Sequence, residues 1–179
     1  MALSSTIYTF DITLSDVDRG VYDNLNLKAA CHPSETPEYF LTRVLAYCLE
    51  YREGIAFSKG LSEAGEPTIA VRDLTGALTS WIEIGSPDAS RLHLASKACE
   101  RVAVYTHKVP RIVLQAYEGQ KIHRADRIEF YALDRELLAG LVRRLERRMK
   151  LTLSVTEGQL FIDVAGESLT GTVERHAIG

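Results

Sequence analysis

Two glutamates suited to metal chemistry, Glu66 and Glu83, lie in neighbouring segments that the sequence predicts to be strands. If the turn between the strands is centred on residues 74–75, Glu83 pairs directly with Glu66. Directly opposed side chains in a sheet lie roughly 5 Å apart at their β-carbons, so two negative charges placed there repel each other. A divalent cation, a basic side chain or a raised pKa on one carboxyl group would relieve that repulsion.

Magnesium is a cation that suits such a pair. Proteins hold Mg²⁺ with one or two carboxylates together with phosphate oxygens of the substrate. The bound ion would generate hydroxide and stabilise the charge that develops when a phosphodiester is hydrolysed. The pattern therefore predicts a metal site at Glu66 and Glu83. The alternative is a register shifted by one residue, which would turn one of the two side chains to the other face of the sheet.

A third carboxylate, Glu38, falls in the first turn of a predicted helix over residues 37–51. It lies three residues before Leu41 and seven before Leu45, so it flanks the apolar face of that helix. A glutamate at this position either looks into a cleft beside the sheet or complements the positive end of the helix dipole. Both interpretations remain open from the sequence.

The elements that would position these carboxylates follow from the spacing of apolar residues. Helical spacing predicts helices over residues 37–51, from 87 onward, and over 110–117 and 135–149. Alternation and short apolar runs predict strands over residues 5–14, 21–30, 55–59, 68–72, 77–84, 102–105, 128–133, 151–155, 160–164 and 169–174, with a loop over 60–65. The strand–helix–strand segment 78–105 implies a parallel crossover. The sequence thus predicts an α/β or mixed α+β fold in one domain over residues 1–179.

Basic residues crowd the end of the last predicted helix. They are Arg143, Arg144, Arg147, Arg148 and Lys150. A solvated helix face is one interpretation, and a track for a phosphate backbone is the other.

The composition places limits on partners and location. With 21 basic and 24 acidic residues the net charge is -3, whereas nucleic-acid binders usually carry a basic excess. A local basic patch is still compatible with that balance. No run approaches the roughly 18 apolar residues that span a bilayer, and the first residues lack the pattern of a signal peptide. We therefore expect a cytoplasmic protein with no membrane partner.

Several short motifs of this chain are found, in the same order and spacing, in a known family. They are Ile7-Tyr8, His32-Pro33-Ser34-Glu35-Thr36, Phe57-Ser58-Lys59-Gly60-Leu61-Ser62, Glu66-Pro67, Arg72-Asp73-Leu74-Thr75-Gly76, Trp81-Ile82-Glu83-Ile84-Gly85 and Pro87-Asp88. On these motifs the chain resembles the YaeQ family from its N-terminus to its C-terminal hairpin. The resemblance implies a variant of the PD-(D/E)XK, or restriction-endonuclease-like, fold. That fold would be a mixed central sheet flanked by helices, here with additional antiparallel strands at both ends.

The resemblance also implies a site. Enzymes of this fold use an acidic residue on one strand and a (D/E)-x-K signature on its antiparallel neighbour, often helped by a glutamate of the first helix. Glu83 matches the acidic part of the signature and Glu66 matches the strand before it, while Glu38, or else Glu35, would be the helix residue. The implied activity is that of a magnesium-dependent nuclease, with manganese as a substitute, acting on nucleic-acid phosphodiesters.

The chain departs from the implied site at three positions. Gly85 stands where the signature has its lysine. Leu94 stands, beside His93, where a lysine of the next helix could substitute, and Thr68 stands where the family often has an acidic residue. Lys97 lies one turn further along the same helix face and could take the role of the lysine. The alternative function is a catalytically degenerate protein of the same fold with a binding or regulatory role.

Overall fold

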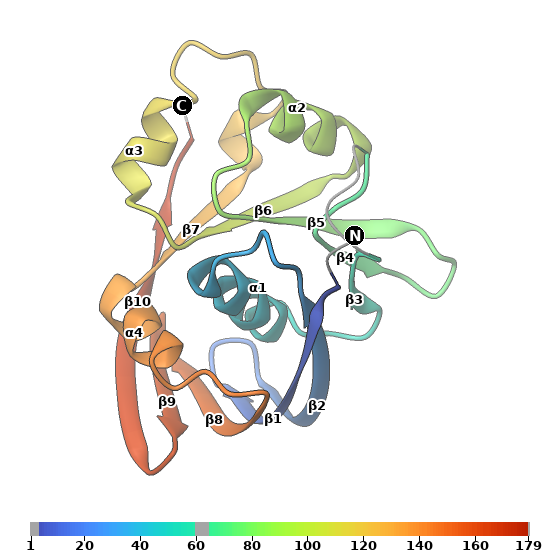
Figure 1. Cartoon of the computed structure of the whole chain (residues 1–179). Helices are drawn as coiled ribbons and strands as arrows, with labels where there is room; N and C mark the ends of the chain where they lie inside the picture. The colour runs from blue at the N-terminus through green and yellow to red at the C-terminus, as the bar shows by residue number, and fades with distance from the viewer. Residues whose placement is uncertain (1–3, 60–64, 179) are drawn as a thin grey trace. The chain divides into compact units, whose positions relative to one another are not determined.

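The computed structural model describes residues 4–59 and 65–178, which divide into two compact units (Figure 1). The first unit combines the chain up to Val44 with Leu133–Glu174, and the second combines Leu45–Ala132 with the chain from Arg175. Each unit is thus assembled from segments far apart in the sequence. The prediction of one domain over residues 1–179 stays a prediction. Most of the loop predicted over residues 60–65, with the end of the motif at 57–62, lies outside the described residues.

The first unit is organised by two hairpins. The strands β1 (Thr6–Asp16) and β2 (Val21–Cys31) pair antiparallel around a tight turn. On its other side, β1 pairs in parallel with β8 (Arg148–Thr156). The strand β8 pairs antiparallel with β9 (Gln159–Val164), and β9 pairs antiparallel with β10 (Glu167–His176). Every second residue is buried, so the alternation in the sequence becomes one apolar face. Both predicted hairpins and the predicted third C-terminal strand are confirmed.

The last helix, α4 (Arg135–Val142), is shorter than predicted. It begins where expected, with the Asp134 carboxylate accepting the Leu137 N–H at 2.8 Å. Residues 148–156 form β8 instead of a further turn of helix, because Met149 and the apolar residues after it alternate with period two and pair with β1. The basic residues at 143–150 therefore do not share one helix face, and the predicted extension of the helix to residue 149 was wrong. A phosphate track formed by these residues stays a prediction.

The chain passes from the first unit to the second within α1 (Pro37–Leu49). Thr36 caps the helix as the sequence indicates, since its hydroxyl oxygen accepts the Tyr39 N–H at 3.1 Å. The apolar side of the helix is fully buried, including Phe40, Leu41 and Leu45.

The second unit contains a mixed sheet. Its strands are β3 (Ile55–Phe57), β4 (Ile69–Arg72), β5 (Leu78–Ile84), β6 (Arg101–Thr106) and β7 (Glu129–Leu133). The first three pair antiparallel in order, whereas β5, β6 and β7 are parallel. The helix α2 (Ala89–Ala98) connects β5 to β6 as the predicted parallel crossover, and α3 (Pro110–Gln115) and a short 3₁₀ turn (Ala125–Arg127) follow β6.

The two faces of this sheet differ in chemistry. On one face Trp81, Val104 and Phe130 form an apolar core with the buried side of α2, including Leu92. The other face carries polar side chains of β6 and β7, described below. Both units combine strands with helices, so the predicted mixed α+β class is confirmed. Within the described part of the chain, no helix has the length and apolar character needed to cross a bilayer.

Candidate functional site

Glu83 is a buried carboxylate in the middle of the second unit, only 3% exposed. Four hydrogen bonds reach its two oxygens. The indole N–H of Trp81 donates at 2.7 Å and the guanidinium of Arg91 at 2.8 Å, both to Oε1. The hydroxyl of Thr68 donates to Oε2 at 3.1 Å, and its backbone N–H reaches Oε1 at 3.4 Å. Both oxygens of this carboxylate are therefore occupied by protein donors.

The predicted pairing of Glu83 with Glu66 was wrong. The strands β4 and β5 pair Ile69 with Ile82 and Ala70 with Trp81, so the register leads to Thr68 opposite Glu83. Two one-residue shifts cause the difference. The Asp73 N–H donates to the carbonyl of Ala77, whereas a turn centred on residues 74–75 would place Asp73 opposite Gly76. A β-bulge between Val71 and Arg72 then adds the second shift.

Glu66 itself is exposed and precedes β4. Its backbone carbonyl, not its carboxylate, joins the site, because it accepts from Arg91 Nη2 at 2.6 Å. The same nitrogen thus links the chain at Glu66 to the Glu83 carboxylate. Among residues 4–59 and 65–178, no cluster of three or more His, Cys, Asp or Glu side chains is arranged to hold a metal ion. The assignment of a metal to Glu66 and Glu83 stays a prediction.

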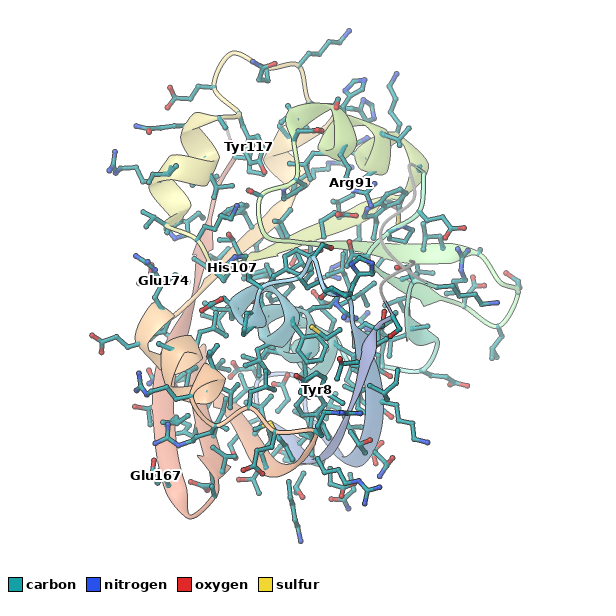
Figure 2. The ribbon with its side chains drawn as sticks, viewed as in Figure 1. Tyr8, Arg91, His107, Tyr117, Glu167 and Glu174 are labelled. Carbon is teal, nitrogen blue, oxygen red and sulfur yellow. The ribbon has the colours of Figure 1, made fainter. Side chains whose placement is uncertain are left out.

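Arg91, which the sequence reasoning missed, is held in place by the first turn of α2 (Figure 2). The Asp88 carboxylate caps the helix by accepting the Arg91 N–H at 2.9 Å and the Ser90 hydroxyl at 2.7 Å. The Ser90 hydrogen bond, followed by that of the Arg91 N–H, lowers the pKa of Asp88, so the cap is ionised at neutral pH. The guanidinium then lies over the Trp81 ring at 5.7 Å. The signal available in the sequence was an arginine three residues after a helix cap, on the helix that follows the strand of Glu83.

Lys97 lies on a different face of α2 from Arg91. Six residues separate the two, which leaves their side chains roughly 120° apart around the helix. Lys97 is exposed and borders a hollow of about 300 Å³ together with His123, Arg124 and Arg127. Burial, followed by the positive charges of Arg124 and Lys97, lowers the pKa of His123. The structure therefore places Lys97 among other cations and gives it no contact with Glu83.

The two helix glutamates lie in the first unit. Glu38 is exposed in the first turn of α1, where it complements the helix dipole. Glu35 is more deeply placed, because its carboxylate pairs with Arg43 at 3.1 Å and accepts the His32 N–H at 3.2 Å. These contacts fix the loop that leads into α1. A catalytic role for Glu38, or for Glu35, stays a prediction.

A second polar network, also missed from the sequence, lies on the other face of the sheet in the second unit. Its centre is Glu50, only 2% exposed, whose two oxygens accept from both terminal nitrogens of Arg101 at 2.9 Å. The Tyr105 hydroxyl donates to the same carboxylate at 2.9 Å. Arg101 Nε also pairs with Glu129 at 2.7 Å, and the Tyr131 hydroxyl donates to Glu129 at 2.7 Å.

The charges of this network stabilise one another. Although burial opposes it, the Tyr131 hydroxyl and then Arg101 lower the pKa of Glu129. Burial, followed by the hydrogen bond to Glu129, raises the pKa of Tyr131 to about 12. The carboxylate is thus ionised and the phenol neutral at neutral pH. Because each of these groups has its partner, we interpret the network as a scaffold that fixes β6 and β7.

Comparison with known proteins covers almost the whole chain. The family model described as YaeQ protein matches residues 1–173. The protein named Uncharacterized protein YaeQ in Escherichia coli (strain K12) is 31% identical over 164 residues, covering 90% of each chain. The protein of the same name in Salmonella typhi is 32% identical over 171 residues, covering 94% of each chain.

Two crystal structures give the same result. The YaeQ protein from Pseudomonas syringae is 32% identical with a TM-score of 0.83, and the match covers 96% of this chain and 95% of that one. The YaeQ protein from Xanthomonas axonopodis pv. citri is 28% identical with a TM-score of 0.87, and the match covers 98% of this chain and 100% of that one. Because sequence and fold agree over nearly their full lengths, this chain belongs to the YaeQ family.

Proposed function

We propose that this YaeQ protein is a catalytically degenerate relative of the PD-(D/E)XK nucleases that binds nucleic acid without cleaving it. The antiparallel neighbours β4 and β5, with Glu83 on β5 and Glu66 just before β4, support the fold part of the proposal. The observation that carries the functional part is the occupied carboxylate of Glu83.

A magnesium ion at Glu83 would have to displace donors that the fold holds in place. The carboxylate is buried, and Arg91, its one positive partner among residues 4–59 and 65–178, is fixed by the capped turn of α2. Breaking a buried ion pair by removing one partner costs about 3–5 kcal/mol. A site that binds magnesium readily instead presents free carboxylate oxygens and room for water. Glu83 therefore favours a structural role over catalysis.

The cations around the hollow beside α2 support a nucleic-acid partner. Lys97, Arg124 and Arg127 border it together, and none of them takes part in an ion pair within the described residues. Unpaired cations gain most from phosphate oxygens, and such contacts supply most of the affinity for nucleic acid. Since the net charge is -3, we expect weak binding that falls steeply with salt.

The test combines cleavage, metal binding and nucleic-acid binding. Purified protein is incubated with plasmid, single-stranded DNA and RNA in magnesium or manganese, beside Glu83→Gln. We expect no cleavage, no magnesium binding by calorimetry, and a gel shift with single-stranded nucleic acid that weakens from 50 to 200 mM salt. Lys97→Gln with Arg127→Gln should weaken the shift several-fold, whereas Lys150→Gln in β8 is the matched control. A shift that these two substitutions leave unchanged would contradict the proposed surface.

Magnesium-dependent cleavage is the second candidate function, and one observation favours it. Arg91 Nη2 contacts both the Glu66 carbonyl and the Glu83 carboxylate. If Arg91 moved away, Glu83 would be left beside the chain at Glu66, as a metal site requires. Cleavage by the wild-type protein that is lost in Glu83→Gln would establish this function and overturn the proposal of a catalytically degenerate protein. A cytoplasmic location, expected from the sequence, stays a prediction.

A further inference from the structure

A hollow of about 590 Å³ in the second unit lies where the parallel strands end. One side is formed by residues 86–90, which follow the carboxyl end of β5 and lead into α2. The other side is formed by Lys108, which follows the carboxyl end of β6, and by α3 with the residues after it. Sheets with parallel strands bind ligands outside the carboxyl ends of those strands. The volume also falls within the range of about 300–1,000 Å³ typical of small-molecule sites.

The wall of this pocket on the α3 side is apolar. Ile112 is 58% exposed, which is high for an isoleucine, whereas Val113 and Tyr117 are almost fully buried. The Tyr117 hydroxyl donates to the Pro87 carbonyl at 2.6 Å, so its polar end is already used, and Tyr117 also lines the pocket. Ala116 completes the wall. A flat apolar group placed here would cover the exposed Ile112 and gain from its burial.

The pocket also carries a positive charge, at Lys108. The Lys108 ammonium donates to the Ser86 hydroxyl at 2.9 Å and takes part in no ion pair with a carboxylate among the described residues. Asp88 also borders the pocket, but its carboxylate is committed to capping α2 through Ser90 and the Arg91 N–H. Lys108 is therefore available to an incoming anion.

We propose that this pocket binds a small organic anion whose flat apolar body lies against Ile112, Ala116 and Tyr117 and whose carboxylate or phosphate pairs with Lys108. The Ser86 hydroxyl, whose oxygen accepts from Lys108, keeps its own proton to donate to the anionic group. The site does not depend on Glu83 or on nucleic-acid binding, so it goes beyond the function proposed above.

Three naphthalene probes test the site and separate the two kinds of anionic group. The probes are 1-naphthyl phosphate, 1-naphthoate and the uncharged 1-naphthol, each titrated into ¹⁵N-labelled full-length protein. We expect saturable shifts in the backbone amides of residues 86, 88–90 and 112–117. Both anions should bind about tenfold more tightly than 1-naphthol, because a charge-assisted contact to Lys108 is gained. The tighter of the two anions identifies the preferred group.

Two substitutions of exposed residues separate the charge from the apolar wall. Lys108→Gln should weaken both anions about tenfold and leave 1-naphthol unchanged, whereas Ile112→Ser should weaken all three probes several-fold. Lys150→Gln, in the other unit, removes the same charge as a control. Shifts confined to other parts of the chain, or equal effects of Lys108→Gln and Lys150→Gln, would overturn the proposal. The amide signals that shift in the wild-type protein identify where the probe binds even if a variant folds poorly.

Discussion

At the scale of single residues, Arg91 connects three groups. Its guanidinium pairs with Glu83, donates to the Glu66 carbonyl and lies over the Trp81 ring. In the predicted site a metal ion would bridge Glu66 and Glu83, and in the structure an arginine side chain occupies a comparable position. A guanidinium presents several N–H donors in a fixed, planar arrangement, so one side chain can contact both groups at once.

The strength of this bridge can be measured by a double-mutant cycle. Arg91→Met removes the charge and keeps much of the side-chain length. We expect the free energy of unfolding to fall by about 3–5 kcal/mol, because Glu83 is left buried with neutral donors alone. Adding Glu83→Gln should recover part of that loss. Urea denaturation of the four proteins gives the coupling energy directly.

An exposed arginine of α3 provides the control for that cycle. Arg111→Met should change the free energy of unfolding by less than about 0.5 kcal/mol, as surface substitutions usually do. If Arg91→Met lowered the free energy of unfolding as little as Arg111→Met, Arg91 could leave the Glu83 carboxylate easily. That result would favour the hypothesis of metal-dependent cleavage.

At the scale of elements, α4 and β10 approach each other unusually closely in the first unit. A Cβ atom added at Gly171 would lie 2.7 Å from the Cβ of Asp134 and 2.8 Å from that of Leu137. No side chain fits there without movement of the backbone. The glycine therefore allows β10 to pass directly against the capped start of α4.

Gly171→Ala tests this close contact. We expect a loss of about 1–3 kcal/mol, because the added methyl group must push α4 away from β10. The control is Thr170→Ala, which changes the preceding residue, whose side chain is exposed. Thermal denaturation compares the two variants. Equal melting temperatures for the two variants would mean that α4 shifts without cost.

Most of the strands could be predicted from the sequence, but the end of α4 and one strand register could not. Alternation of apolar residues predicted β1, β2, β8 and β9, because each of these strands buries a single face. The end of α4 was missed because Leu145 and Met149 continue a helical spacing, while pairing with β1 decides the structure. The register at Glu83 was missed because a bulge leaves no mark in the residue types.

The candidate sites were harder to predict than the elements. The sequence singled out Glu83 as a metal ligand, which stays a prediction, and its observed partners Thr68 and Arg91 lie far from it in the sequence. The network of Glu50 and Arg101 joins residues that lie 51 positions apart, which no local pattern reveals. Contacts of this kind follow from the packing of whole elements.

At the scale of the whole molecule, each unit is closed by a segment that returns from far along the chain. The second unit includes the chain from Arg175, and Ile178 is buried there at 5% exposure among Val104, Tyr117 and Phe130. Residues more than forty positions after β7 thus complete the core that supports Trp81. This arrangement makes the stability of the second unit dependent on the last described residues.

Ile178→Ala should weaken the second unit selectively. Removing a buried isoleucine side chain down to alanine costs about 2–5 kcal/mol. Hydrogen exchange followed by mass spectrometry should show faster exchange in β5, β6 and β7 than in the wild-type protein, with β1, β2 and β8 little changed. A uniform increase over both units would instead show that they unfold together. Ile7→Ala, at an exposed position of β1, serves as the control.

Trp81 gives the protein a built-in optical signal. It is the one tryptophan in the sequence, its indole N–H donates to Glu83, and the Arg91 guanidinium lies over its ring. Indole emission depends on nearby charges and on access to water, so any event that separated Arg91 from Glu83 would alter the spectrum. Unlabelled protein can therefore be monitored by fluorescence for metal entry, ligand binding or loosening at this position, and every change observed comes from a single known place in the molecule.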